Sequence, residues 1–204
     1  MLVTAVAAFV GIIAGGLLPP AAHRYARPTV RWPAVLVAGV ALIALGTRMD
    51  GDAGLRLVAG GYGVLITGIV ANFHLVGMGV LLLGLGANAI VIVANSGMPV
   101  HRAALVAAGA TANGDDIALS GHRVLEHGST KLTILDDRIP LPAGGQVVSF
   151  GDLVVAVGLA DATAHIIRRR RRDALVEASL AVELDAEFVG AERTRRPAHL
   201  VSTG

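Results

Sequence analysis

Two polar side chains at the start of the last apolar run, Ser149 and Asp152, carry the strongest chemical signal in the sequence. They are three residues apart, so a helix would place them on one face. Ionisable groups inside a membrane segment are costly and are often functional. Asp152 could therefore bind a proton or a cation at the outer end of a cavity. Alternatively, it could brace the preceding loop by pairing with Arg138 or with the backbone N–H groups of residues 96–100.

Two amides in the preceding apolar run, Asn88 and Asn95, are the next candidates. They are seven residues apart, which places both on one helical face. Amide hydrogen bonds between membrane helices contribute about 0.6 kcal/mol each, so helix packing is one interpretation. The other interpretation is that the two amides and Asp152 line a polar cavity at the outer side.

Asp161 and His165 are a second possible ionisable pair, four residues apart in the last run. Asp161 is nine residues beyond Asp152 and would lie on the opposite face of the same helix, so the two aspartates cannot form one paired-carboxylate site. A proton relay between them would need a further polar group on the way. The simpler interpretation is that Asp161 and His165 pair near the lipid headgroups.

Signatures of enzymatic chemistry are lacking in the sequence. There is no cysteine, and no HExxH or GxSxG spacing occurs. The glycine-rich stretches lie in apolar runs without the βαβ setting of a nucleotide site. Histidines and aspartates are scattered through the segment 96–146, at positions 101, 115, 116, 122, 127, 136 and 137. We therefore expect a non-enzymatic protein with no catalytic residue, no metal site and no cofactor.

Long apolar runs must position these residues. The hydrophobic set makes up 54% of the 204 residues and charged residues 16%, against about 25% charged residues in soluble domains. A membrane-spanning helix needs about 17 to 25 mostly apolar residues. The apolar run at 33–47 reaches that length only if Arg31 and Trp32 join it. The expected fold is an all-α integral membrane protein with about five transmembrane helices, at 2–18, 32–47, 57–73, 75–95 and 147–167.

Arginines indicate the orientation of these spans. Arg24, Arg27 and Arg31 follow the first run, and basic residues beside spans mark the cytoplasmic side. The last run ends in five consecutive arginines, Arg168, Arg169, Arg170, Arg171 and Arg172. We expect them to anchor the helix at anionic lipids, each contributing about 1 kcal/mol, and we do not expect a nucleic-acid partner. The N-terminus would then lie outside and the C-terminus in the cytoplasm.

The rest of the chain divides into an outer loop and a tail. Residues 1–172 would form the membrane domain, with a partly ordered outer loop at 96–146 that folds over the outer mouth of the bundle. Within this loop, 101–110 predicts a short helix and 121–137 a pair of short strands. The cytoplasmic tail is 173–204. Its segment 173–188 is typical of a helix that lies on the membrane surface or on a partner, with an apolar stripe at Leu175, Leu180 and Leu184.

Glycines recur on single faces of the expected helices. They occur as the pairs Gly11 and Gly15, Gly61 and Gly68, and Gly77 and Gly84. Because small residues let helix backbones approach closely in lipid, the spacing predicts a tightly packed bundle.

Three motifs in order resemble an uncharacterised family of small bacterial multi-pass membrane proteins, a domain of unknown function. They are NSGMPV at 95–100, TKLTILDDRIPLP at 130–142 and VVSFGDLVVAVG at 147–158. The resemblance implies an integral protein of a bacterial cytoplasmic membrane, but no activity or ligand. We therefore expect a non-catalytic accessory or scaffold subunit, with another membrane protein or a second copy as partner. The alternative is a small transporter of protons, cations or solutes that uses the intramembrane aspartates and asparagines.

Overall fold

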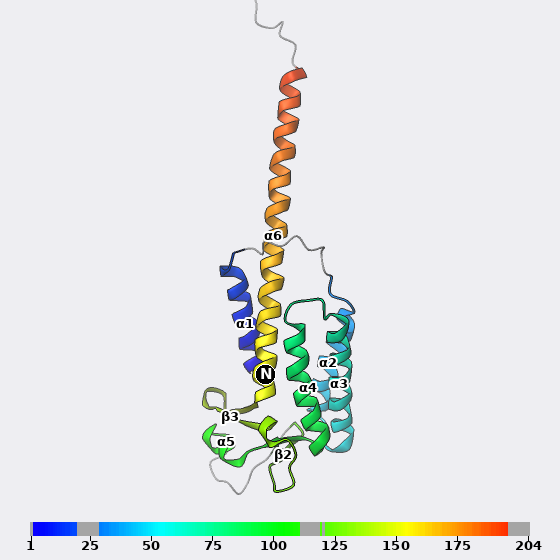
Figure 1. The fold of residues 1–204 in the computed structure, drawn as a ribbon, viewed down its shortest axis with the longest axis vertical. Helices are drawn as coiled ribbons and strands as arrows, with labels where there is room; N and C mark the ends of the chain where they lie inside the picture. Colours follow the sequence, from blue (N-terminus) through cyan, green and yellow to red (C-terminus); the bar gives the residue numbers. More distant parts are fainter. Residues whose placement is uncertain (1, 20–28, 111–118, 120, 196–204) are drawn as a thin grey trace, which may run out of the picture.

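Helices dominate the architecture. The computed structural model describes residues 2–19, 29–110, 119 and 121–195. Apolar helices form a bundle, and a small sheet covers one end of it (Figure 1). The bundle helices are α1 (Leu2–Leu17), α2 (Pro33–Gly46), α3 (Gly51–Ala71), α4 (Met78–Asn95) and α6 (Phe150–Arg195).

Three of these helices, α3, α4 and α6, are long and apolar enough to cross a membrane. The other two, α1 and α2, are apolar but have only 16 and 14 residues, or about 24 and 21 Å at 1.5 Å per residue. Trp32 does not extend α2, because it adopts a left-handed backbone with φ of 50° and the helix begins at Pro33. The structure therefore supports three spans by length, and two shorter helices stand where the others were expected.

Glycines bring the helices together as their spacing predicts. A Cβ added to Gly11 would lie 2.5 Å from the Ala160 carbonyl oxygen of α6. A Cβ on Gly61 would lie 2.8 Å from Ile43 of α2, and one on Gly77 2.8 Å from the Ala162 nitrogen of α6. Such distances leave no room for a side chain, so the prediction of close helix packing is confirmed. The glycine pair in α1 contacts α6 of the same chain.

The all-α expectation is confirmed only in part, because a small four-stranded mixed sheet accompanies the helices. Its strands are β1 (Met98–Val100), β2 (Arg123–Leu125), β3 (Asp137–Leu141) and β4 (Gln146–Ser149), in the spatial order β2-β1-β3-β4. Strand β1 is parallel to both β2 and β3, and β3 pairs with β4 in antiparallel fashion. The segment 121–137 does contain strand residues, but β2 and β3 do not pair with each other because β1 lies between them. The short helix expected at 101–110 is present as α5 (Arg102–Ala107).

Strand β1 was hidden in the sequence for a physical reason. It has three residues, follows directly on an apolar helix and contains Pro99, which cannot donate a backbone hydrogen bond. The backbone hydrogen bonds of the residues on either side of Pro99 hold the strand in the sheet instead. The Met98 N–H donates to the His122 carbonyl at 2.8 Å, and the Val100 carbonyl accepts from the Glu126 N–H at 3.1 Å.

Contacts with the helix ends fix the sheet to the bundle. A ring nitrogen of His122 lies 2.8 Å from the Gly46 carbonyl oxygen at the end of α2. Asn95, at the end of α4, accepts from the Lys131 N–H at 2.8 Å and donates to the Lys131 carbonyl at 2.9 Å. The segment 96–149 therefore covers the end of the bundle where α4 finishes and α6 starts (Figure 1).

The last helix differs most from expectation. Residues 146–149 form β4, so α6 begins at Phe150 and not at residue 147. It then runs for 46 residues without a break to Arg195, a length of about 69 Å. The helix predicted at 173–188 is present, but it is not a separate element, because this segment continues α6 away from the bundle (Figure 1). No glycine or proline occurs between Gly158 and Gly190 to interrupt it.

Two arginines of the cluster contact the end of α1. Arg168 donates to the Pro19 carbonyl at 3.0 Å. Arg171 donates to the Gly16 carbonyl and, at 3.3 Å, to those of Gly15 and Leu18. The last carbonyls of a helix have no partner within the helix, so these side chains cap α1.

Arg171→Ala is expected to loosen the end of α1. Its carbonyls would lose charge-assisted hydrogen bonds worth about 1 kcal/mol at this exposed site, and amide exchange across residues 12–19 should be about fivefold faster. Hydrogen exchange with mass spectrometry measures this, with Arg170→Ala as the neighbouring control. Equal exchange in both variants would contradict the capping role.

Candidate functional site

A reciprocal cap at the start of α6 holds Asp152. Ser149 precedes the helix, and its Oγ accepts from the Asp152 N–H at 3.0 Å. The Asp152 carboxylate in turn accepts from the Ser149 N–H at 3.2 Å. Serine before a helix and a carboxylate three residues later form a capping box, which satisfies two backbone donors at once. A negative charge in the first turn also favours the helix dipole.

Asn88 connects this cap to α4. Its amide donates to the Asp152 carboxylate at 2.7 Å, and its oxygen accepts from the Ser149 hydroxyl at 3.1 Å. Asn88 is 3% exposed and Ser149 is fully buried. Gly151 makes the approach possible, because a Cβ there would overlap the Asn88 amide. The side chain of Tyr62 in α3 also interacts with Asn88.

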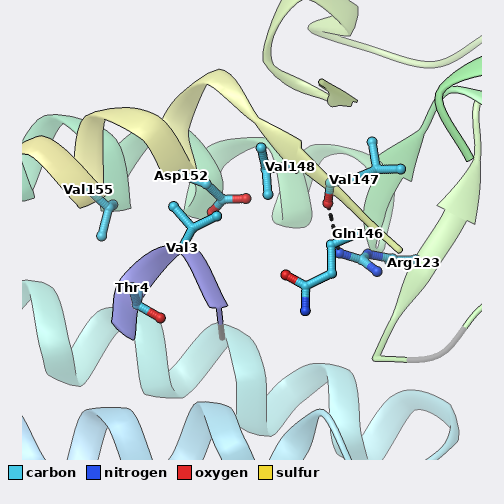
Figure 2. Close-up of a pocket in the computed structure, with 8 residues that line it drawn as sticks. All are labelled: Val3, Thr4, Arg123, Gln146, Val147, Val148, Asp152 and Val155. Carbon is cyan, nitrogen blue, oxygen red and sulfur yellow. Dashed lines mark hydrogen bonds between the residues drawn. The ribbon is translucent and has the colours of Figure 1, made fainter. Parts of the chain in front are cut away.

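A cavity of about 160 Å³ lies beside Asp152 (Figure 2). It is bounded by the start of α1, the start of α6 and the sheet. Its polar lining comes from Asp152, Arg123, Gln146 and Thr4, and its apolar lining from Val3, Val147, Val148 and Val155. The Arg123 guanidinium also donates to the Val147 carbonyl at 3.1 Å. The space therefore lies between a carboxylate in the helix layer and a guanidinium in the sheet.

Arg123 forms an ion pair with a buried carboxylate of β3. Its Nε lies 3.0 Å from Asp137 Oδ2, and Asp137 is 2% exposed. Burial raises the pKa of Asp137 to about 7, although Arg123 opposes the shift, and the Asp152 charge raises it further. The pair thus joins β2 to β3 across β1. The Asp137 carboxyl changes its protonation state near neutral pH.

Stability of the sheet is expected to fall as the pH rises towards neutral. Folded Asp137 keeps its proton up to about pH 7, whereas the unfolded chain releases it near pH 4. Stabilisation by this group is therefore complete below about pH 4 and is lost as the pH rises through 7, with a slope of at most about 1.4 kcal/mol per pH unit. Hydrogen exchange of 98–100 and 137–149, corrected for intrinsic rates, should show more protection at about pH 5 than at about pH 8.

Asp137→Asn should remove this pH dependence, because the side chain no longer titrates. Asp185→Asn, at an exposed position far from the sheet, is the control and should retain it. A pH profile of the sheet that is unchanged in Asp137→Asn would assign the dependence to another group.

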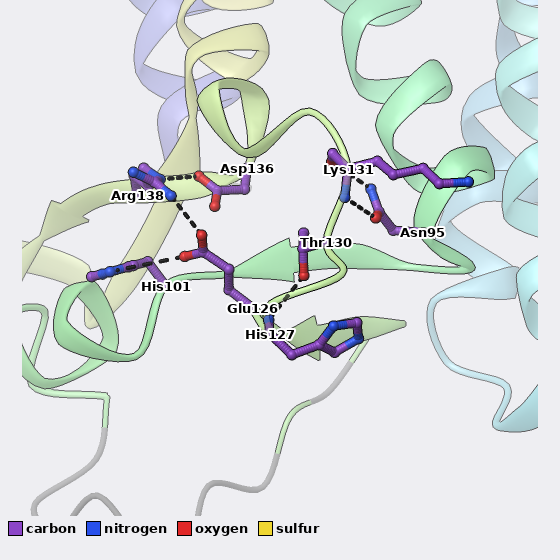
Figure 3. Close-up of polar contacts among 8 residues, drawn as sticks. All are labelled: Asn95, His101, Glu126, His127, Thr130, Lys131, Asp136 and Arg138. Atoms are coloured by element: carbon purple, nitrogen blue, oxygen red, sulfur yellow. Dashed lines mark hydrogen bonds and ion pairs between the residues drawn. The ribbon is translucent and has the colours of Figure 1, made fainter.

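Arg138 of β3 belongs to a separate cluster with residues that flank β1, β2 and β3 (Figure 3). It contacts Asp136 at 2.6 Å and Glu126 at 2.7 Å, and Glu126 lies 3.8 Å from His101. The predicted pairing of Arg138 with Asp152 therefore does not form. Burial raises the pKa of Asp136, and Arg138 opposes the shift.

Asp115 and Asp116 lie outside the described residues, and the described residues contain no group of three or more acidic or histidine side chains that could hold a metal ion.

The remaining candidates lie apart from Asp152. Asn95 donates to the Val91 carbonyl at 3.0 Å and binds the Lys131 backbone (Figure 3), so it holds the loop and does not line the cavity. Asp161 and His165 pair at 3.1 Å, and both are about two-fifths exposed. The structure thus brings together Asn88, Ser149 and Asp152, although of these three only Asp152 lines the cavity. Asn95 and the Asp161–His165 pair lie apart from them.

A comparison with protein families identifies the chain. The model of a family of unknown function, DUF5317, matches residues 29–162. This chain belongs to the DUF5317 family. No curated protein and no solved structure matches it.

The DUF5317 match covers the hydrogen-bonded group Asn88, Ser149 and Asp152 and the Arg123–Asp137 ion pair, and leaves out two neighbouring parts, one of which, α1, lines the cavity through Val3 and Thr4. It includes Asn88, Arg123, Asp137 and Asp152, but neither α1 nor the arginine cluster. The three sequence motifs at 95–100, 130–142 and 147–158 all lie inside it. They supply β1, β3 and β4, which are neighbours in the sheet, and the first turns of α6. The DUF5317 region is therefore the sheet, the cap and the helices that hold them.

Several residues of the DUF5317 site were missed in the sequence. Arg123 and Asp137 are 14 positions apart and meet only because β2 and β3 flank β1. Tyr62 and Gln146 reach the site from α3 and β4. The adjacent acidic residues Asp136 and Asp137 were the signal in the sequence that could have indicated two ion pairs. Asp136 pairs with Arg138 and Asp137 pairs with Arg123.

Proposed function

We propose that this chain is a non-catalytic scaffold subunit of a complex in a bacterial cytoplasmic membrane. The observation that carries the proposal is the continuation of α6 beyond the arginine cluster. Residues 173–195 extend it by about 35 Å, and Leu180, Leu184 and Phe188 on it are 54%, 66% and 72% exposed. Binding another surface would stabilise a helix with large exposed apolar side chains, since burying apolar surface contributes about 25 cal/mol per Å².

Five spans are proposed, with the N-terminus outside and the C-terminus in the cytoplasm. In this arrangement the cytoplasmic side holds the end of α1, which lies near Arg168, the end of α3, which lies near Arg31, and the arginine cluster within α6. Positively charged flanks favour that side. Arg24 and Arg27 also support this orientation by sequence, although they lie outside the described residues. Local thinning of the bilayer can accommodate the shorter α1 and α2, at a modest cost.

A structural role for the intramembrane polar residues supports the proposal. Asn88, Ser149 and Asp152 hydrogen-bond to one another, so they hold helix and sheet together without a ligand. We propose no catalytic residue, no cofactor and no nucleic-acid partner. The expected partners are anionic lipids at Arg168–Arg172 and another membrane-associated protein.

Purification from membranes tests the scaffold proposal. The tagged chain is cross-linked, extracted in mild detergent and analysed by native mass spectrometry. A stoichiometric second protein, lost when residues 173–204 are removed, is the expected result. Recovery of the chain alone from cross-linked membranes would contradict the proposal.

A transport path is the second candidate, and the cavity beside Asp152 is the observation that favours it. Proton and cation flux into proteoliposomes would then fall in Asp152→Asn, and in Asp161→Asn if the path continued along α6. The scaffold proposal expects the same flux in the wild type, in both variants and in empty liposomes.

A further inference from the structure

The extension of α6 combines exposed apolar residues with a high density of acid. Every described side chain from Ala174 to Phe188 is exposed. Five carboxylates lie in 173–188, and no basic residue lies among them. This segment, here called the acidic rod, projects from the bundle (Figure 1). A helix that is exposed on all sides and carries this much apolar surface is short of a packing partner.

The residues of the acidic rod are arranged in ridges. Val176, Leu180, Leu184 and Phe188 repeat every four positions and form one continuous apolar ridge, since residues four apart are neighbours along a helix surface. The adjacent ridges, at positions three before and three after, hold all the carboxylates. Glu177 and Asp185 lie in one, together with Asp173, which already pairs with Arg172 at 3.2 Å, and Glu183 and Glu187 lie in the other. Helices pack most often by inserting such four-spaced ridges into the grooves of a neighbour.

Charge decides between the possible occupants of the ridge. Anionic lipid would be repelled by the flanking carboxylates, and α6 also directs the rod away from the bundle and the bilayer. A second copy in the same membrane would run parallel, because both rods continue spanning helices. Its carboxylates would then face like carboxylates, which is destabilising. A helix with an apolar ridge flanked by lysines or arginines matches in both shape and charge.

We propose that the acidic rod binds a basic amphipathic helix of a partner protein. The apolar ridge packs into the groove of that helix, and the flanking carboxylates pair with its lysines and arginines. This inference rests on the proposed scaffold function and specifies the chemistry of the partner. The face opposite the ridge, with Leu175 and Val182, is outside the contact.

Binding of a defined peptide tests the inference. The full-length protein is placed in nanodiscs of zwitterionic lipid, and a fluorescent synthetic helix is added that has leucines at four-residue spacing flanked by lysines. Saturable binding above that to empty nanodiscs is expected, and it should weaken as salt is raised. Equal binding of the counterpart with glutamates in place of lysines, or of a peptide with the same composition in scrambled order, would overturn the proposal.

Matched variants locate the contact. Leu180→Ala with Leu184→Ala should weaken peptide binding at least about tenfold, whereas Leu175→Ala with Val182→Ala should change it little. Alanine preserves helix propensity, and circular dichroism checks that both variants are folded. Glu177→Gln, Glu183→Gln and Glu187→Gln together should remove most of the salt dependence. Equal losses from the two alanine pairs, or dimerisation of the wild type that depends on Leu180 and Leu184, would contradict the proposed occupant.

The same variants separate this inference from the scaffold proposal. If cross-linked membranes yield no partner with the wild type, the scaffold proposal fails. If they yield a partner that remains bound after Leu180→Ala with Leu184→Ala, the scaffold proposal stands and the assignment of the ridge is wrong.

Discussion

Gly84→Ala is expected to push α4 away from α6 and to destabilise the protein by roughly 2 to 3 kcal/mol, within the range for overpacked cores. An added Cβ would lie 2.7 Å from both the nitrogen and Cγ2 of Val155, and 2.8 Å from the Gly151 carbonyl oxygen. Two of these atoms belong to the backbone, so they cannot move aside by a rotamer change. Because Asn88 is one turn further along α4, the displacement should also stretch its hydrogen bonds to Ser149 and Asp152.

The matched control for Gly84→Ala is two residues away on the same helix. A Cβ on Gly86 meets no atom within 4 Å, and alanine is favoured over glycine in helices by about 1 kcal/mol. Gly86→Ala should therefore leave stability unchanged or raise it. Thermal unfolding in detergent, followed by circular dichroism, compares the two variants. A melting temperature that falls equally in both would contradict the close crossing of α4 and α6.

Asp152→Ala is expected to cost roughly 2 to 4 kcal/mol. Loss of a helix cap costs about 1 kcal/mol, and the buried Asn88 amide would lose its 2.7 Å acceptor, which costs about 1 to 3 kcal/mol more. Asp152→Asn keeps an acceptor oxygen and should be milder. The loss should appear as faster hydrogen exchange at the start of α6 and in β4, and as a lower melting temperature.

Asp161→Ala is the control for the loss of a carboxylate from the same helix. Asp161 pairs with His165 at a site that is about two-fifths exposed, and such pairs contribute about 0.3 to 0.5 kcal/mol. Its melting temperature should therefore stay close to that of the wild type. If Asp152→Ala were as stable as Asp161→Ala, the capping network would not hold the sheet to the bundle.

Much of the helical fold was predictable because its signals are local. Long apolar runs located the helices, and the recurrence of Gly77 and Gly84 predicted the close packing that the structure shows. The spacing of Ser149 and Asp152 placed both on one face, but the capping box also depends on where α6 starts. That start at Phe150 is set by β4, which completes the sheet with β3.

The sheet and its ion pairs were not predictable from local patterns. Its central strand β1 has three residues and includes Pro99, so neither length nor hydrogen-bonding rules favour a strand there. Arg123 and Asp137 meet across this strand. With no strand expected at 98–100, Arg138 was the nearest visible partner for Asp152. In the structure Arg138 is already held by Asp136 and Glu126.

Because α6 is a single continuous helix, a small tilt near its start displaces its far end by a larger distance. The Ser149–Asp152 cap holds its first turn, and α1 packs against it as far as Arg171. Phe188 lies about 57 Å along the axis from Phe150. A tilt of about 5° of α6 about the cap, together with α1, would displace Phe188 by about 5 Å, nearly one helical turn. A shift of the sheet at the start of α6 would therefore reach Phe188 as a displacement, without any rearrangement within the helix.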